Sequence, residues 1–210
     1  MMLKITDLKP QKKDPQRLNV YLDGEFAFGI ARAVAPWLKV GEQLSPKEIE
    51  ELKTEDEIQK AYQRALNYLS YRSRSSAEIK RNLHKHDVPD DAIEEVVRRL
   101  TERGLVDDLA FAETWVENRA AFHPRSRWAL RSELRQKGVS NQVIDKAIAE
   151  VDDYEMAYKV AQKKIRRIRN LEQPEFNKKL YGYLSRRGFP YQVCKETAQR
   201  VWDELEKNQA

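Results

Sequence analysis

The chain repeats one short pattern three times, at intervals of 51 and 50 residues. Each copy starts with a leucine, continues with polar residues and ends with an apolar residue, and the copies occupy residues 83–88, 134–139 and 184–189. Self-similarity at a fixed period of this length indicates a chain built from copies of one supersecondary unit. Stacked units present a long surface rather than one deep pocket. The repeat therefore favours the binding of a macromolecule over catalysis in a cleft.

Within each repeat, apolar residues recur at the three- and four-residue spacing of an amphipathic helix. Matching positions carry similar side chains, which are Ile79/Leu130/Leu180 on a second helix and Ile93/Ile144/Cys194 on a third. Gly138 and Gly188 match Asp87, and all three residue types tolerate a left-handed turn. The predicted fold is mainly α, with three tandem three-helix repeats that form an elongated, curved array behind a small N-terminal β-hairpin module.

Four domains follow from these patterns. The hairpin module and an acidic linker are expected to occupy residues 1–54, and the three repeats are expected to occupy residues 55–106, 107–153 and 154–210. Each repeat alone offers only a small core, so neighbouring repeats are expected to share apolar surface.

The segment 17–30 carries the strand signal of the sequence. Apolar residues alternate on both sides of Asp23-Gly24, namely Leu18, Val20 and Leu22 before it and Phe26, Phe28 and Ile30 after it. A two-residue loop would place the two apolar sets on opposite faces of the hairpin, whereas a three-residue loop would place them on one face. We therefore expect a three-residue loop with Gly24 in the left-handed conformation, and Ile5 in a third strand.

Two capping signals precede the first repeat. Ser45-Pro46-Lys47-Glu48 combines a serine N-cap, a proline at the first helical position and a glutamate at the third. Residues 54–57 repeat the capping pattern, which predicts a separate, longer helix over residues 55–71. Residues 42–57 hold seven carboxylates against two lysines and are assigned to the linker.

Each candidate catalytic or metal-binding pattern in the sequence is better explained by a structural role. Cys194 is the single cysteine, which excludes an internal disulfide, and its place in the repeat predicts a buried apolar role. His84 and His86 fit a helix end better than a metal site. Asp107 and Asp108 precede an apolar helical run, where N-capping explains them. We expect no enzymatic activity, no cofactor and no metal.

Positive charge is concentrated on the first two helices of each repeat, whereas the third helices are acidic or mixed. Residues 159–169 hold six basic residues and no acid, and residues 87–108 hold eight carboxylates against three arginines. Stacked repeats would align the basic helices into a stripe that suits a phosphate backbone or an acidic partner. The candidate binding residues are Arg72, Arg74, Arg125, Arg127, Arg131, Arg135, Lys163, Lys164, Arg166 and Arg167.

Plainer explanations of these features stay open. A net charge of +5 and an isoelectric point near 9.1 also suit ordinary solubility, and a basic helix face can simply be solvated. Aromatic residues interleave with the basic ones, as Tyr68 and Trp128 do, and they either stack on bases or pack between helices. No stretch approaches eighteen apolar residues, so no membrane association is expected.

Four segments, in order along the chain, resemble the RecX family of regulatory proteins. The first is Arg17-x-x-Val20-x-Leu22-Asp23-Gly24, and the second is Ala65-Leu66-x-x-Leu69-x-x-Arg72-x-Arg74-Ser75-x-x-Glu78-Ile79-x-x-x-Leu83. The others are Arg103-Gly104-Leu105-Val106-Asp107-Asp108-x-x-Phe111-Ala112 and Leu130-x-x-x-Leu134-x-x-Lys137-Gly138-Val139. One departure is Asp87, which stands where the family often has glycine and which bears on turn geometry.

The resemblance implies a cytoplasmic bacterial protein that regulates the RecA recombinase in DNA repair, recombination and the SOS response. Family members are built from three-helix repeats, lodge in the groove of the RecA–DNA filament and suppress recombinase, ATPase and co-protease activity. The implied partners are the RecA filament and single- or double-stranded DNA without sequence preference, and the chain is expected to be a monomer. The family offers no agreed catalytic site, so the ten basic residues rest on the charge pattern alone.

Two other functions compete with this one. The chain can be a sequence-independent nucleic-acid-binding protein without a recombinase partner. Three-helix units also resemble helix-turn-helix modules, but no recognition helix is well marked, which disfavours a transcription factor.

Overall fold

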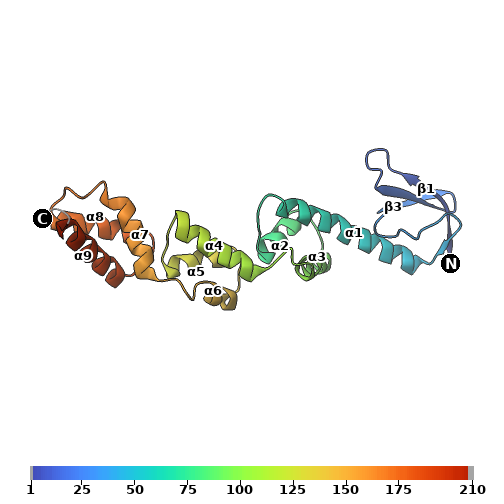
Figure 1. The fold of residues 1–210 in the computed structure, drawn as a ribbon. Coiled ribbons are helices and arrows are strands. Elements are labelled where there is room, and N and C mark those ends of the chain that lie inside the picture. The colour runs from blue at the N-terminus through green and yellow to red at the C-terminus, as the bar shows by residue number, and fades with distance from the viewer. Residues whose placement is uncertain (1, 208–210) are drawn as a thin grey trace. The chain divides into compact units, whose positions relative to one another are not determined.

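A computed structural model describes residues 2–207, and in it the chain forms a small antiparallel sheet followed by helices α1 to α9 (Figure 1). The chain divides into two compact units. The first unit comprises the residues up to Arg74 together with Glu78–Val106, and the second comprises Ser75–Ala77 and the residues from Asp107 onward. The mainly helical fold with an N-terminal strand module agrees with the sequence prediction.

The N-terminal sheet has the strand order β3-β2-β1-β4, and each neighbouring pair is antiparallel. Its strands are β1 (Leu3–Pro10), β2 (Arg17–Leu22), β3 (Glu25–Ala31) and β4 (Gln43–Leu44). Ile5 is fully buried in β1, as the prediction of a third strand requires. One face of the sheet carries the core of this module, because period-two alternation sends the apolar side chains to the same side.

The turn between β2 and β3 has two residues, and the predicted three-residue loop is wrong. Leu22 pairs with Glu25, so only Asp23 and Gly24 connect the strands. Both have positive φ, 49° for Asp23 and 92° for Gly24, which matches the hairpin turn that fits the twist of two strands. The expected left-handed conformation of Gly24 is confirmed.

A β-bulge, rather than a longer loop, brings apolar residues of β2 and β3 to the same face of the sheet. Val20 pairs with Phe28 but Tyr21 pairs with Phe26, so Ala27 is the extra residue on β3. The extra residue restores the phase of the strand, and Val20 and Phe28 are both buried on the core face. Phe26 lies before the bulge and is 59% exposed, with its ring edge-on to Tyr21 at 5.9 Å, so its predicted place in the core is wrong.

Helix α1 (Pro46–Leu69) begins with the predicted capping box. The Glu48 amide donates to Ser45 Oγ at 3.2 Å, and the Ser45 amide donates to the Glu48 carboxylate at 2.7 Å. These two bonds satisfy amides that the first helical turn cannot pair internally. The hydrogen bonds of the capping box also lower the pKa of Glu48.

The predicted second helix start at Thr54 is wrong, because α1 runs through this position without a break. No glycine or proline interrupts residues 47–69, and the buried face continues at helical spacing on both sides of Thr54. Ile49 and Leu52 pack in the sheet core, whereas Ala61 and Ala65 pack in the core of the first repeat. One helix therefore serves both cores, and a domain boundary at residue 54 stays a prediction.

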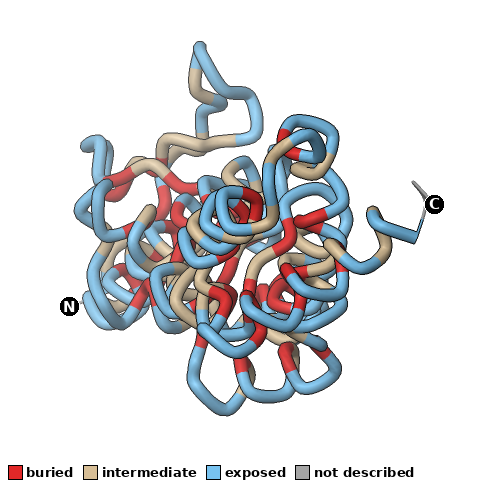
Figure 2. The backbone as a smooth tube through the Cα atoms, turned by 90° about the vertical axis from the view of Figure 1, so that its left-hand side faces the viewer, coloured by how far each residue is buried: buried red, intermediate tan, exposed pale blue. Residues whose placement is uncertain are grey.

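The helices form three groups that correspond to the predicted repeats. The first repeat adds α2 (Ser76–His84) and α3 (Asp90–Glu102), the second has α4 (Asp108–Phe122), α5 (Arg127–Gln136) and α6 (Asn141–Ala147), and the third has α7 (Asp153–Ile165), α8 (Gln173–Ser185) and α9 (Tyr191–Lys207). Each repeat has its own apolar cluster, in which the matching leucines Leu83, Leu134 and Leu184 are fully buried. Buried segments alternate with exposed ones along the backbone, as Figure 2 shows.

The repeated turn after each second helix has the predicted left-handed residue. The φ angles are 57° at Asp87, 81° at Gly138 and 85° at Gly188. A glycine or aspartate suits this position because larger side chains pay a steric cost there. Gly104 ends α3 in the same conformation, and the following Leu105 amide donates to the Leu100 carbonyl at 2.9 Å.

Cys194 is buried in the core of the third repeat, as its position predicted. Burial raises the pKa of its thiol to about 11, so the thiolate that reacts with electrophiles is scarce. Within residues 2–207, no helix is both long and apolar enough to cross a bilayer.

Candidate nucleic-acid interface

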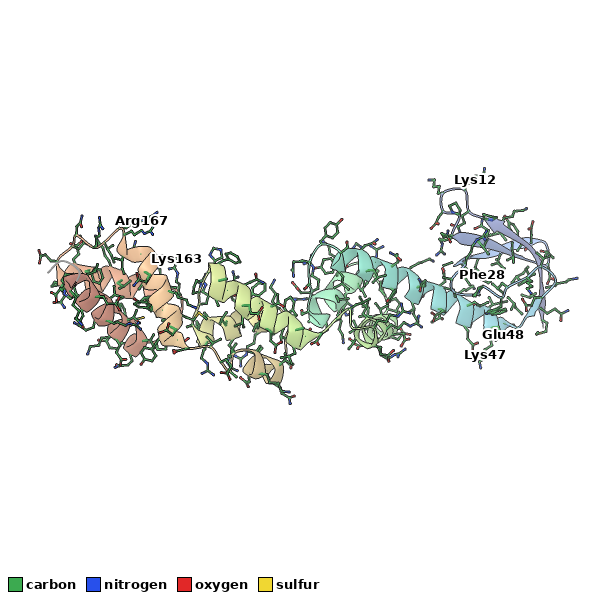
Figure 3. All side chains as sticks on the ribbon, in the orientation of Figure 1. Lys12, Phe28, Lys47, Glu48, Lys163 and Arg167 are labelled. Atoms are coloured by element: carbon green, nitrogen blue, oxygen red, sulfur yellow. The ribbon has the colours of Figure 1, made fainter. Side chains whose placement is uncertain are left out.

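The strongest run of positive charge lies on α7 and in the turn that follows it. Asp152 caps the N-terminus of α7, and its carboxylate accepts from the Tyr154 amide at 2.8 Å. Lys163 and Lys164 occupy the last turn, where cations stabilise the negative end of the helix dipole. Lys163 and Arg167 are labelled in Figure 3. The helix thus begins at an acidic cap and ends in basic residues, which concentrates the positive charge at one end.

Two adjoining hollows lie beside α7 in the second unit. The larger has a volume of about 760 Å³ and is lined by Ala120, Ala121, Pro124, Tyr158, Lys159, Gln162, Lys163, Ile165 and Arg166. The smaller has a volume of about 150 Å³ and is lined by Phe122, His123, Pro124, Arg125, Val160, Lys163, Tyr183 and Arg187. Pro124 and Lys163 line both hollows, which we together call the basic groove. None of these lining residues is an Asp or a Glu.

The groove lies where the second repeat meets the third, and hydrogen bonds donated by main-chain amides hold this junction. The Arg127 amide donates to the Asp153 carboxylate at 2.7 Å, and the Ser126 amide donates to the Arg187 carbonyl at 3.3 Å. Burial raises the pKa of Asp153, and the hydrogen bond from the Arg127 amide and the positive charge of Arg127 partly offset this effect. A Cβ at Gly188 would lie 2.7 Å from Ser126 Oγ, so the two repeats meet closely there.

Cations stack on Tyr183 at one end of the groove. The Arg187 guanidinium lies 3.7 Å from the centre of the Tyr183 ring, and Lys164 Nζ lies 5.2 Å from it. Arg187 also donates to the Tyr183 carbonyl at 3.1 Å. Such stacking orients the side chains while leaving their charge uncompensated by a carboxylate. Lys164 therefore lies close to the groove, and its role in binding stays a prediction.

The structure places the two candidate arginines of the first repeat in internal contacts. Arg72 donates to both oxygens of Glu78, at 3.2 and 2.8 Å, and this pairing raises the pKa of Arg72. The Arg74 guanidinium lies 3.9 Å from the ring centre of Tyr68, and its Nε is buried without a hydrogen-bond partner among the described residues. Both side chains contribute to local packing at the start of α2.

The candidates of the second repeat differ in how far their charge is matched. Arg131 forms an ion pair with Asp145, and Arg125 Nε lies 3.7 Å from Glu133, which also binds Arg119 at 2.7 Å. Arg135 donates to the neutral Asn141 at 2.9 Å, so its charge is not compensated there.

Arg127, Arg166 and Arg167 are exposed, and none of them pairs with an acidic side chain in the part of the chain that the structure describes. Lys163 is exposed as well, and its Nζ reaches the Phe122 carbonyl at 3.5 Å. These four residues are the candidates whose charge is most available to a ligand. The structure brings Lys163 and Arg166 into the groove together with Arg125, whereas Arg72 and Arg74 belong to the other compact unit.

Sequence reasoning missed three groove residues. Lys159 belongs to the basic run at residues 159–169, so its charge was a usable signal. Arg187 and Phe122 line the groove because the third repeat packs against the end of α4. Local sequence patterns do not predict this packing.

The charges of α3 form a self-contained cluster. Hydrogen bonds from Arg98 and Arg99 lower the pKa of Glu95 to about 2. Arg99 also binds both oxygens of Glu55 on α1, at 2.6 and 2.8 Å. Both arginines of α3 are thus engaged by carboxylates, so neither is free for an anionic partner. Among residues 2–207, no group of three or more His, Cys, Asp or Glu side chains could hold a metal ion.

A small sheet module, tandem three-helix repeats and a basic groove between the last two repeats define a class of modular repeat protein. Four family models match the chain in order: the regulatory protein RecX N-terminal domain over residues 3–45, and the first, second and third RecX three-helix domains over residues 61–100, 107–148 and 150–198. The chain belongs to the RecX family of regulatory proteins.

Relatives of known sequence and structure support this assignment. The chain is 31% identical to regulatory protein RecX of Bacillus pumilus (strain SAFR-032), over 97% of this chain and 79% of that one. It is 34% identical to regulatory protein RecX of Limosilactobacillus reuteri (strain DSM 20016), over 91% and 74%. A crystal structure of regulatory protein RecX matches with a TM-score of 0.74 and 34% identity, over 91% of this chain and 96% of that one. RecX from Lactobacillus salivarius matches with a TM-score of 0.63 and 26% identity, over 70% and 97%.

Proposed function

We propose that this protein regulates the RecA recombinase by binding the RecA–DNA filament and that it inhibits the recombinase, ATPase and co-protease activities of the filament. Membership of the RecX family supports the choice of partner. The observation that carries the binding mode is the basic groove, whose lining combines five Lys and Arg residues with no Asp or Glu. A DNA filament offers the complementary negative charge.

The proposed mechanism is binding without chemistry by this chain. Arg127, Lys163, Arg166 and Arg167 meet DNA phosphates or acidic groups of the recombinase, because no ion pair within the described residues competes for them. Occupation of the filament groove hinders the entry of a homologous duplex, or hinders filament growth. The protein acts in the cytoplasm and binds as a monomer without sequence preference.

The ion pairs divide the ten candidate residues into two groups. Arg72, Arg125 and Arg131 have carboxylate neighbours, so a bound phosphate has to compete with Glu78, Glu133 or Asp145. No ion pair among the described residues involves the other candidates, which are Arg74, Arg127, Arg135, Lys163, Lys164, Arg166 and Arg167; of these, Arg127 still acts electrostatically on Asp153. We therefore assign the larger share of binding to the second group, and especially to residues 163–167.

The decisive experiment is a titration of this protein into RecA on single-stranded DNA, with ATP hydrolysis and strand exchange as readouts. We expect both activities to fall as the protein approaches stoichiometry with the recombinase. The inhibition is expected to weaken as salt is raised, because phosphate-dominated binding loses affinity with ionic strength. If neither activity changes at stoichiometric excess, the proposal is wrong.

A sequence-independent nucleic-acid-binding protein without a recombinase partner is the second candidate function. The acid-free lining of the groove favours it, because such a surface suits bare nucleic acid as well as a filament. Binding to naked single strands as tight as to RecA filaments would support this function over recombinase regulation.

A further inference from the structure

We propose that the basic groove holds one strand of nucleic acid directly, with phosphates on Lys159, Lys163 and Arg166 and an unstacked base on Phe122. The inference rests on the proposed function and deepens it, because it names which part of a nucleoprotein filament the second unit touches. In this arrangement the groove prefers a single strand to a duplex.

The three cations are spaced to follow one strand. Lys159, Lys163 and Arg166 are separated by four and three residues, so they share one face of α7 and its last turn. All three line the larger hollow. At a rise of 1.5 Å per residue they extend over about 10 Å along the helix. A negatively charged backbone that runs along α7 therefore meets a cation at each helical turn.

One acid that contacts a lining residue of the groove is already matched. Glu204 on α9 accepts a hydrogen bond from Tyr158, a lining residue, at 2.7 Å. Arg200 pairs with the same carboxylate at 3.2 Å and stacks 3.9 Å from the centre of the Tyr158 ring. The negative charge of Glu204 is thus offset at the rim, and the interior of the groove keeps its positive potential.

Phe122 supplies the flat apolar surface that a base needs. It is the last residue of α4, it lines the smaller hollow, and it is 68% exposed. Lys163 Nζ reaches its carbonyl oxygen at 3.5 Å, which places a phosphate-binding cation beside the ring-bearing residue. A cationic track beside an aromatic platform is the usual arrangement in proteins that bind single strands. The bases of a duplex are stacked on each other and cannot use the ring.

The first repeat carries an exposed aromatic residue at the same position. Tyr71 precedes Ser75 by four residues, as Phe122 precedes Ser126, and it is 83% exposed. An acidic peptide would use the cations of the groove but has no need for an exposed ring at a repeated position. Two of the three repeats thus carry an exposed ring at this position, whereas the third has Glu172, and an exposed ring suits nucleic acid better than an acidic protein segment.

The test measures binding of the full-length protein to a fluorescein-labelled oligothymidylate by fluorescence anisotropy, without any recombinase. Lys163→Glu combined with Arg166→Glu is expected to weaken binding at least about tenfold. The salt dependence is expected to flatten, by roughly 0.7 in the log–log slope for each phosphate that the variant no longer binds. Lys146→Glu combined with Lys195→Glu makes the same change in net charge at exposed positions outside the groove, and it is expected to change affinity less than about twofold.

Phe122→Ala tests the stacking step separately. It is expected to weaken oligothymidylate binding about tenfold, as the removal of one base–aromatic stack does. Binding to a duplex of the same length is expected to stay unchanged, and Phe122→Tyr is expected to restore wild-type affinity. Circular dichroism checks that each variant keeps the helical content of the wild type.

Several results would overturn the inference. One is an equal decrease in affinity in the groove pair and the control pair, which would mean diffuse electrostatic binding. Another is an equal effect of Phe122→Ala on single strand and duplex. A third is stronger competition from a polyglutamate peptide of equal charge than from oligothymidylate, which would assign the groove to an acidic protein. Because RecA is absent, none of these results bears on recombinase inhibition, which the ATPase titration tests by itself.

Discussion

Two clusters of charge in this protein differ in one respect, which is whether the molecule supplies its own counter-charges. In the first unit, the Asp56 side chain is 3% exposed and accepts Arg17 at 2.7 Å and Lys60 at 2.8 Å. In the second unit, Arg166 and Arg167 are exposed and have no acidic partner among the described residues. The first cluster holds elements of the fold together, and the second leaves its charge for a ligand.

The paired cluster explains a residue that sequence resemblance singled out. Arg17 opens the N-terminal signature, and its guanidinium donates to Asp56 and to the Gly29 carbonyl on the edge strand β3, the latter at 3.3 Å. Asp56 also accepts from the Ala31 amide on that strand at 2.8 Å. The pair thus fastens β3 to α1 and covers polar groups of a sheet edge that could otherwise pair with another chain. The signature arginine has a structural role here.

Removal of the buried carboxylate should have the largest effect on stability. Asp56→Ala leaves the charge of Arg17 and the Ala31 amide without their partner, and the removal of one member of a buried pair costs about 3 kcal/mol or more. Urea denaturation monitored by circular dichroism should show this decrease. A matched control is Glu51→Ala on the same helix, which breaks the exposed Lys47–Glu51 pair and should cost less than about 1 kcal/mol. Equal decreases in the two variants would contradict the structural role of Asp56.

The free energy of unfolding should depend on pH through the same carboxylate. Burial raises the pKa of Asp56, but hydrogen bonds from Arg17, Lys60 and the Ala31 amide outweigh it, so the pKa lies below the ordinary value of 3.8. A folded-state pKa below the unfolded one stabilises the fold above the unfolded value, and this stabilisation is lost as pH falls through the folded pKa. The difference in free energy of unfolding between wild type and Asp56→Asn should therefore decrease as pH falls below 3.8. A gap that widens in acid would contradict this.

A smaller effect distinguishes paired from unpaired candidates within α5. Arg131→Glu places two like charges together, because Arg131 faces Asp145, and it should lower stability by about 1 kcal/mol. Arg127→Gln should change stability by less than about 0.5 kcal/mol, because Arg127 is exposed and forms no ion pair among the described residues. Thermal unfolding of the two variants measures the difference. An equal decrease would show that the ion pair is not what separates them.

The repeat pattern carried enough information to predict most of the fold. Leu83, Leu134 and Leu184 are fully buried at matching positions, and Asp87, Gly138 and Gly188 all adopt the left-handed turn. Such positions are predictable because each is fixed by a local period and by the steric preference of its own residue type.

Features that depend on contacts between elements could not be predicted in the same way. The bulge at Ala27 changes the phase of β3 after the turn, and the alternation of apolar residues is equally compatible with a longer loop. The capping pattern at Thr54 is also compatible with a helix interior, where α1 continues. The pairing of Arg131 with Asp145 across fourteen residues removed a candidate from the free cations, and only the packing of α5 on α6 decides it.

The central claim is that the uncompensated cations form the binding surface. Its most direct test is RecA ATPase activity on single-stranded DNA, titrated with Arg166→Glu/Arg167→Glu and with the control Lys146→Glu/Lys195→Glu. We predict that half-inhibition by the first variant needs at least about tenfold more protein than the wild type, while the control stays within about twofold. Both variants should keep wild-type stability to within about 1 kcal/mol for each substitution, because Arg166 and Lys146 lie at helix C-termini. Undiminished inhibition by Arg166→Glu/Arg167→Glu would contradict the claim.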